Sequence, residues 1–459
     1  MENLLIQNAT IATSTEVFFG DILVENEKIS KVGEKIPAPP DTKTIDATGK
    51  ILLPGGVDSH THFDFDIGFD RTSDDFYTGT VAAAIGGTTT VIDHLAFGPK
   101  NCRLTHQPEV YHRLTERAVV DYGFHGVIQH VDDQVLEDMR VLRDVEGISS
   151  FRVALTTNNM LADADLLTVF NRAKELGLLI CAHCENDAMV SALQKMYLAE
   201  GNTTPRFHPL SRPAESEEEA VFRVLMLAQT AGDAKVNILR LSTRLGLNAV
   251  HAARRGGQEN IFVGTCPQYL LLEDHLYETP NALQYIVNPP LRKSADTEAL
   301  WNELSGGAID TIGSDHRPFF FAAQKCRGEN DFTMTPQGLP GVELRMALLF
   351  SEGYCKKRIT LQDLVRQCCT RPAEIFGIAP RKGDIRVNLD ADFVLFDPEI
   401  EWRVEQEELH ENVDYTPYDG MLLRGKPVMT ISRGEIIVEN GEFLGSEGRG
   451  QYLHRREGW

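Results

Sequence analysis

The middle of the sequence, residues 51–378, alternates eight short apolar runs with longer stretches of helical spacing, and this alternation limits the possible folds most strongly. Stretches such as 164–174 and 217–231 repeat apolar residues at the spacing of an amphipathic helix. Eight strand-then-helix units in one domain predict an α/β protein with a closed, parallel (β/α)₈ TIM barrel rather than an open doubly wound sheet. The expected strands are 51–57, 88–95, 122–129, 149–156, 178–184, 235–242, 260–266 and 307–313.

The two ends of the sequence have a different pattern, in which turn-like residues separate short apolar runs. This pattern covers residues 1–50 and returns after about 380. Two strand-rich ends around one barrel predict a small β-sandwich to which both termini contribute. We therefore expect sandwich strands in 1–53 and 379–459, with an oligomerisation tail in the second segment, and the barrel in 54–378.

The charge balance narrows the choice of partners. The 459 residues include 45 Lys and Arg against 67 Asp and Glu, a net charge of −22. Such a surface repels phosphate backbones and anionic lipids, so neither nucleic acid nor a membrane is expected as a partner. The start has no signal-peptide pattern, and eight cysteines are too few for a disulfide scaffold. These features predict a cytoplasmic protein.

Metal-binding side chains follow three of the expected strands. His60 and His62 are two residues apart, so both imidazoles point to the same side of a strand. His183 ends the fifth strand and Asp315 follows the eighth. Nitrogen and oxygen ligands at the carboxyl ends of barrel strands are typical of a catalytic zinc with an open position for water. The sequence predicts one divalent metal, zinc, held by these four residues, with Asp315 also able to accept a proton.

Longer motifs are distributed over the whole chain. They are PGGVDSHTHF at 54–63, GGTTTVID at 86–93, TCPQYLLL at 265–272, PPLRK at 289–293, GSDH at 313–316, GLPGVE at 338–343 and NVDYTPYDG at 412–420. Together they resemble the D-hydantoinase/dihydropyrimidinase family of cyclic amidohydrolases, and most closely its phenylhydantoinase branch.

The resemblance implies an assembly and a reaction. The assembly is a homotetramer of barrels with β-sandwich flanks, in which residues 448–455 would span subunits. The reaction is the opening of the ring amide of a small cyclic ureide, a hydantoin or a dihydropyrimidine. A hydroxide held between two metals would attack the carbonyl, and Asp315 would carry the proton to the leaving nitrogen.

The sequence departs from this family at the second metal. Arg152 stands where the family has a carboxylated lysine, and Arg240 where it has a histidine. A guanidinium stays protonated and has no lone pair for a metal. At ~5 Å from Zn²⁺ and an effective dielectric constant of ~20, it is repelled by roughly 6–7 kcal/mol. We therefore predict that the second metal is lost.

The residues that hold the substrate ring in the family are changed as well. Thr157 replaces a tyrosine, Asn288 a serine and Gln337 an asparagine. These substrate-binding positions predict a substrate other than hydantoin itself.

Arg317 adds a third arginine to Arg152 and Arg240 at the strand ends. One interpretation pairs each arginine with a nearby carboxylate such as Asp93 or Glu185. The other gives the three guanidiniums a joint role in binding an anionic, acidic analogue of the family's substrates, with bidentate contacts to a carboxylate.

Three functions remain open on the sequence. The first is a hydrolase of a cyclic amide or ureide with one metal. The second is a catalytically silent scaffold or partner subunit, favoured by the lost ligands. The third is a mononuclear deaminase, since barrel deaminases use a similar ligand set.

Overall fold

The computed structural model describes residues 3–157 and 159–455, and its centre is an eight-stranded parallel sheet. Neighbours in the sheet follow the order of the sequence, and an isolated bridge between Thr61 and His316 joins the first strand to the loop after the last. The expected (β/α)₈ barrel is therefore confirmed. Its strands are β6 (Gly56–Thr61), β7 (Thr88–His94), β8 (Asp121–Val127), β9 (Ser150–Ala154), β10 (Leu179–His183), β11 (Val236–Leu239), β12 (Ile261–Thr265) and β13 (Thr311–Ile312).

The first apolar run, predicted as one strand over 51–57, is two strands. β5 (Ile51–Pro54) belongs to another sheet, and the barrel strand β6 begins at Gly56. Between them, Gly55 packs so closely on Thr89 that a Cβ would lie 2.2 Å from the threonine Oγ1. Every residue of both strands is buried, so no change in burial marks the boundary between them in the sequence.

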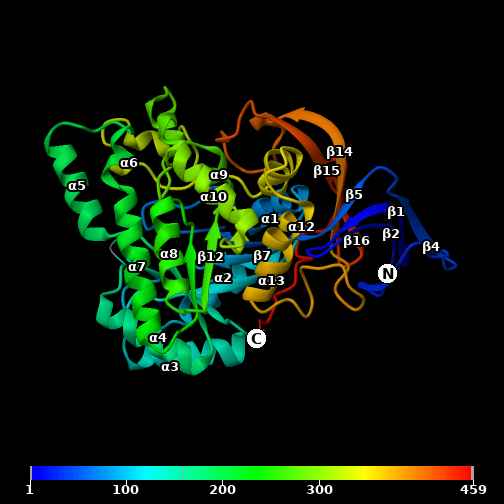
Figure 1. The fold of residues 1–459 in the computed structure, drawn as a ribbon, viewed down its shortest axis with the longest axis horizontal. Coiled ribbons are helices and arrows are strands. Elements are labelled where there is room, and N and C mark those ends of the chain that lie inside the picture. The colour runs from blue at the N-terminus through cyan, green and yellow to red at the C-terminus, as the bar shows by residue number, and fades with distance from the viewer. Residues whose placement is uncertain (1–2, 158, 456–459) are drawn as a thin grey trace.

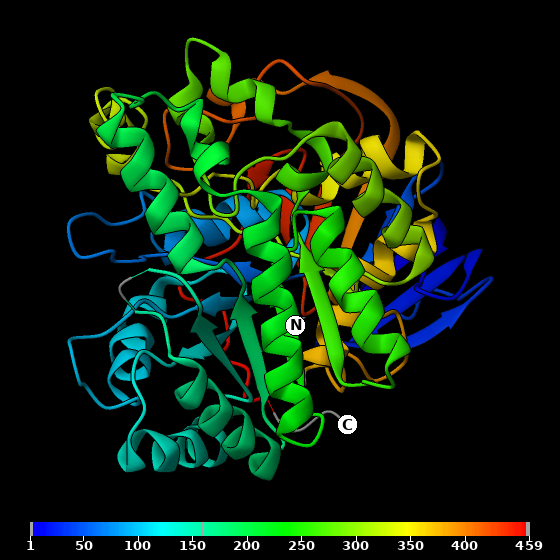
Figure 2. The ribbon, with the colours of Figure 1, turned by 60° about the vertical axis from the view of Figure 1, so that its left-hand side comes forward.

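Helices surround the barrel on its outer side (Figures 1 and 2). Several begin at a capping side chain: Asp75 accepts from the backbone of Thr78 before α1, and Thr243 from Gly246 before α8. The α-helices are α1 (Phe76–Ile85), α2 (His106–Leu114), α3 (Asp133–Val141), α4 (Asp163–Leu176), α5 (Asp187–Ala199), α6 (Phe207–Ser211), α7 (Ala214–Thr230), α8 (Arg244–Arg255), α9 (Pro267–Leu271), α10 (Ser294–Gly306), α11 (Arg345–Leu348), α12 (Leu361–Val365) and α13 (Arg371–Ile375).

A second, nine-stranded mixed sheet lies beside the barrel and contains strands from both ends of the chain (Figure 1). Its order is β17-β16-β15-β14-β5-β1-β2-β3, with β4 parallel to β1. Apolar residues of both ends, among them Ile6 and Phe393, share one core. The strands are β1 (Asn3–Ala12), β2 (Val17–Glu25), β3 (Lys28–Gly33), β4 (Thr42–Asp46), β5, β14 (Phe393–Arg403), β15 (Leu422–Ser432), β16 (Glu435–Glu439) and β17 (Glu442–Phe443).

A buried lysine connects the two parts. Lys382 Nζ lies 2.6 Å from carboxylate oxygens of both Asp121, at the start of β8, and Asp392, next to β14. It also lies 2.9 Å from Asp390. Burial alone would lower the pKa of Lys382, but the carboxylates, led by Asp392, outweigh it and raise that pKa. The ammonium is therefore charged, and it compensates the buried acidic cluster between barrel and sheet together with Arg433 on Asp121 and Arg381 on Asp390.

The end of the described chain closes the amino-terminal end of the barrel. The backbone of Tyr122 in β8 is hydrogen-bonded to Gln451 and Leu453, at 2.9 and 2.7 Å. Arg455 is fully buried and donates to Ser150 Oγ at 2.8 Å. The segment expected to span subunits thus makes these contacts within its own chain.

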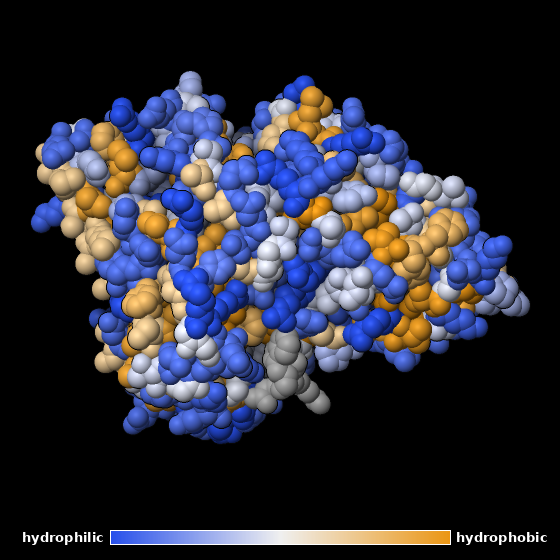
Figure 3. Space-filling model, viewed as in Figure 1, coloured by the Kyte–Doolittle hydropathy of each residue, from blue (hydrophilic) through white to orange (hydrophobic). Residues whose placement is uncertain are grey.

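The outer surface is mostly hydrophilic on the face shown in Figure 3. Exposed apolar side chains include Met189 and Met196 on α5, and Phe222 and Met226 on α7. Among the described residues, each helix is too short or too polar to cross a membrane.

Candidate functional site

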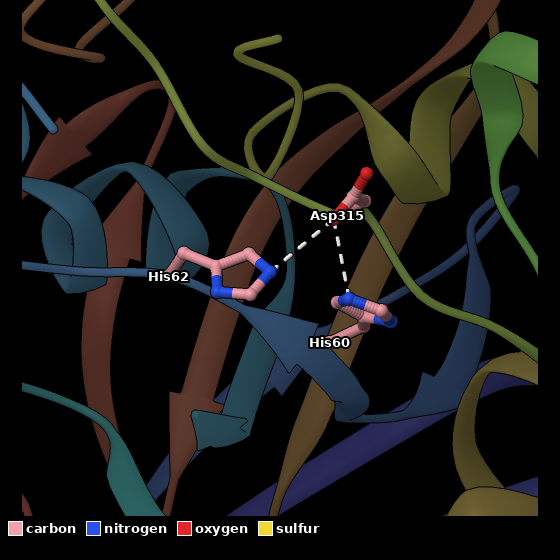
Figure 4. Close-up of side chains that lie close together, drawn as sticks. All are labelled: His60, His62 and Asp315. Carbon is pink, nitrogen blue, oxygen red and sulfur yellow. Dashed lines mark ion pairs between the residues drawn. The ribbon is translucent and has the colours of Figure 1, made fainter. Parts of the chain in front are cut away.

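Two imidazoles and one carboxylate converge at the carboxyl end of the barrel (Figure 4). His60 and His62 come from the end of β6, and Asp315 from the loop after β13. Asp315 Oδ1 lies 3.2 Å from His60 Nε2 and 3.4 Å from His62 Nε2. All three side chains are buried. The structure thus brings together three of the four residues predicted as metal ligands.

The backbone around this cluster is held in a fixed position. The carboxylate of Asp58 accepts from the backbone N–H of His60 and of Ser314, each at 3.1 Å, and so ties β6 to the loop after β13. Asp315 itself has φ = +53°, in the left-handed region that a non-glycine residue seldom adopts. Such strain, of order 1–3 kcal/mol, persists where the surroundings fix the residue, as they do at functional sites.

Arg240 binds the same carboxylate. Its Nη1 lies 3.0 and 3.1 Å from the two oxygens of Asp315, and its Nη2 lies 3.2 Å from His183 Nδ1. Burial would raise the pKa of Asp315, but Arg240 and then His60 outweigh it and hold that pKa well below its ordinary value. Arg240 also has a left-handed backbone, with φ = +54°. The carboxylate is therefore ionised and shared between an arginine and two imidazoles.

His183, the fourth expected ligand, lies outside the three-residue cluster. Its Nε2 lies 2.9 Å from Glu185, whose carboxylate also accepts from Arg212 at 2.7 Å. Burial, and then Arg240, lowers the pKa of His183 to about 4, so the ring is neutral. The neutral ring donates from Nε2 to Glu185 and accepts at Nδ1 from Arg240, which leaves no ring nitrogen for a metal in this arrangement.

Arg152 and Arg317 do not have the carboxylate partners that one interpretation of the sequence expected. Asp93 accepts from Thr61 Oγ1 at 2.7 Å and from a neighbouring backbone N–H, and Glu185 is occupied as described above. Nε and Nη1 of Arg152 and Nε of Arg317 are buried without a hydrogen bond to any described residue. Pairing with Asp93 or Glu185 is therefore wrong for both arginines, and Arg240 pairs with Asp315 instead.

The three residues predicted to bind the substrate ring do not all line the same cavity. Thr157 and Gln337 line a cavity of about 700 Å³ that also contains Arg152 and Arg317. Thr157 has φ = +80°, and its N–H donates to Asp187 at 3.0 Å. Asn288 donates its side-chain amide to Gln337, so these two residues contact each other.

Sequence reasoning missed two further features of the site. Glu185 fixes the tautomer of His183, and its spacing of two residues along the chain could have indicated this. His94, at the end of β7, is the second feature. Its ring centroid lies 4.4 Å from that of His60 and 4.2 Å from that of His125. Burial, followed by His125, holds the pKa of His94 well below its ordinary value, so this stack is uncharged.

The donor set fits one divalent ion. His60 Nε2 and both ring nitrogens of His62 are buried and make no hydrogen bond to a described residue; the two Nε2 atoms face only the carboxylate of Asp315. Buried polar atoms are normally satisfied, so such unpartnered nitrogens beside an ionised carboxylate are suited to a cation. A second ion would face Arg240, which offers only donors.

Known proteins resemble this chain over its whole length. The profile of the Amidohydrolase family matches residues 51–437. A D-phenylhydantoinase of Escherichia coli is 43% identical over 454 residues, which cover 99% of this chain and 98% of that protein. The crystal structure of dihydropyrimidinase from Brevibacillus agri is 40% identical with a TM-score of 0.97, covering 99% of both chains. An L-hydantoinase (dihydropyrimidinase) from Arthrobacter aurescens is 30% identical with a TM-score of 0.89, covering 99% of this chain and 100% of that one.

Proposed function

Because the chain belongs to the amidohydrolase family and its full-length relatives include a phenylhydantoinase, we propose that it opens the ring amide of a cyclic ureide with one divalent metal ion. The coarser assignment, an enzyme that hydrolyses a cyclic amide as hydantoinases do, rests on these relatives. The single metal and an altered substrate go further and rest on the residues of this site.

One observation carries the proposal: the possible ligand atoms of His60, His62 and Asp315 lie within 4.8 Å of one another, and His62 Nδ1 has no hydrogen-bond partner among the described residues. These three side chains would hold the ion, zinc being the metal that such a ligand set favours. A divalent ion here supplies Lewis-acid polarisation of the scissile carbonyl and activation of water.

The protein's own groups would position and move the proton. Asp315 is the group that accepts a proton and delivers it to the leaving nitrogen, because it is the ionised carboxylate of the cluster. Arg240 orients this carboxylate through two hydrogen bonds. His183, fixed by Glu185, in turn accepts from Arg240 and sets the direction of its guanidinium.

A catalytically silent scaffold is the second candidate, and a specific contact favours it. Arg240 contacts both oxygens of Asp315 and so neutralises the charge that would otherwise attract a cation. In that case the barrel would bind a ligand or a partner subunit without turnover. The two candidates differ in metal content, since only the enzyme requires an ion.

Elemental analysis of the purified protein, followed by a substrate screen, tests the proposal. We expect one equivalent of zinc, manganese or iron per chain, and ring opening of at least one compound among dihydrouracil, hydantoins, cyclic imides and acidic ureides. A metal-free protein that remains inactive after incubation with these metals would support the silent scaffold. Metal-loaded protein with no turnover on the panel would overturn the enzyme proposal.

We also propose that the protein is a cytoplasmic homotetramer. The exposed apolar side chains of α5 and α7 support burial of that surface between copies, because exposed apolar patches often mark interfaces. Light scattering of the purified protein measures the assembly directly, and a monomer would contradict it.

A further inference from the structure

We infer that the cavity between Arg152 and Arg317 binds a carboxylate carried by the substrate. This inference rests on the proposed function, since it names the class of cyclic ureide that the same site accepts: one with an acidic substituent on the ring. Both arginines line the cavity of about 700 Å³, together with Phe65, Phe97 and Gln337.

The first argument is the charge of the two guanidiniums. Arg152 is only 6% exposed, and it makes neither a hydrogen bond nor an ion pair from its guanidinium to any described side chain. A buried charge without a partner is strongly unfavourable, so proteins keep such groups paired or reserve them for a ligand. Arg317 stands beside it with its Nε also unpartnered among the described residues.

The second argument is the repulsion between the arginines. Burial, followed by the charges of Arg240 and Arg317, lowers the pKa of Arg152 to about 9. A guanidinium stays protonated at pH 7, so an anion placed between the two arginines relieves a repulsion that the protein alone leaves in place.

The third argument is the aromatic surroundings of the guanidiniums. The Cζ of Arg152 lies 5.6 Å from the ring centroid of Phe97, and that of Arg317 lies 4.8 Å from Phe65. The rings give the guanidiniums cation–π contacts and offer no hydrogen-bond acceptor, so the N–H groups stay available to a ligand. Planar, bidentate contacts are how arginine recognises a carboxylate.

Arg240 is not part of this anion site, although the sequence suggested three arginines together. Its two Nη atoms bind Asp315 and His183. Asp66 is the one acidic residue among the lining residues in the described part of the chain, and it is exposed and faces Arg71 at 3.8 Å. The interior of the cavity therefore carries two positive charges with an open space between aromatic walls.

A matched pair of compounds tests the inference by binding alone. Hydantoin-5-acetic acid and hydantoin-5-acetamide have the same ring and nearly the same shape, but only the first is an anion at pH 7.5. Isothermal titration calorimetry on the purified full-length protein in 0.15 M NaCl should give at least ten-fold tighter binding of the acid. This preference should fall below about three-fold in Arg152→Met and in Arg317→Met, and persist in Arg71→Met, an exposed arginine near the cavity.

Folding of the variants is checked by thermal unfolding. Arg152→Met should unfold no lower than the wild type, because it removes an unpaired buried charge. The acid should raise the unfolding midpoint of the wild type but not of this variant. If Arg152→Met does not fold, Arg317→Met, at a less buried position, carries the test.

Three outcomes overturn the inference: equal affinity for acid and amide, no binding of either compound at millimolar concentration, or a preference that survives both substitutions. Failure of the proposed function has a different outcome. The acid would still bind more tightly than the amide, but neither ring would open in a metal-loaded sample.

Discussion

Replacing Lys382 by Met should weaken the connection between the barrel and the mixed sheet. The ammonium is buried within 2.6 to 2.9 Å of three carboxylates. Methionine keeps most of the side-chain volume and removes the charge. One carboxyl group must then take up a proton for the protein to fold. Asp392 is the candidate, because burial already raises its pKa.

The magnitude follows from the proton that this carboxyl group must bind. An aspartate has an ordinary pKa near 3.9, and each pH unit above it costs about 1.4 kcal/mol when the group is kept neutral. The variant should therefore lose about 4 kcal/mol of unfolding free energy at pH 7, but only about 1.5 kcal/mol at pH 5. The sign is that of a raised folded-state pKa: the folded variant binds more protons than the unfolded chain, so its stability falls as the pH rises.

Urea unfolding followed by circular dichroism at pH 5 and pH 7 measures this difference. Lys28→Met serves as the control, because Lys28 binds Asp390 from a position that is 44% exposed, and such pairs contribute about 0–1 kcal/mol. A loss below 1 kcal/mol at pH 7, or an equal loss at the two pH values, would refute the reasoning.

The remaining predictions concern the site. Arg240→His combined with Arg152→Lys should increase the metal content by one equivalent per chain in elemental analysis, because two guanidiniums that repel a second ion are replaced by ligands of its type; unchanged content contradicts this explanation. His60→Asn should weaken zinc binding at least ten-fold in competition with a chelator, whereas His183→Asn should leave it within about two-fold, since the ring nitrogens of His183 are bonded elsewhere. Equal losses would place His183 among the ligands. Arg212→Met should lower the unfolding free energy by about 3–5 kcal/mol, because it leaves its carboxylate partner buried without a guanidinium, and a loss under 1 kcal/mol in urea unfolding would disprove that role.

The barrel was predictable because its determinants are local. Short segments of the sequence show the alternation of strands and helices. The spacing of His60 and His62 places both side chains on the same face of a strand. The position of Asp315 at the same mouth follows from the parallel barrel, since the carboxyl ends of all eight strands meet there.

The pairing of charges was not predictable, because it depends on residues far apart in the chain. Arg240 and Asp315 are 75 residues apart, and nothing in their local sequences indicates that this arginine binds that carboxylate rather than Asp93 or Glu185. The contact of Arg240 with His183 Nδ1, 57 residues away along the chain, is equally absent from the local sequence. Only the folded barrel shows which arginines pair with a carboxylate and which do not.

The position of β5 between β1 and β14 has a consequence for biosynthesis. β5 ends at Pro54, and its second neighbour β14 begins at Phe393, roughly 340 residues later. At translation rates of about 5–20 residues per second, roughly 20–70 s pass before that neighbour leaves the ribosome. During this time the nascent amino-terminal strands expose an unpaired edge, which invites pairing with other nascent chains. Chaperone binding to ribosome-associated chains should therefore begin early and persist until this edge is covered.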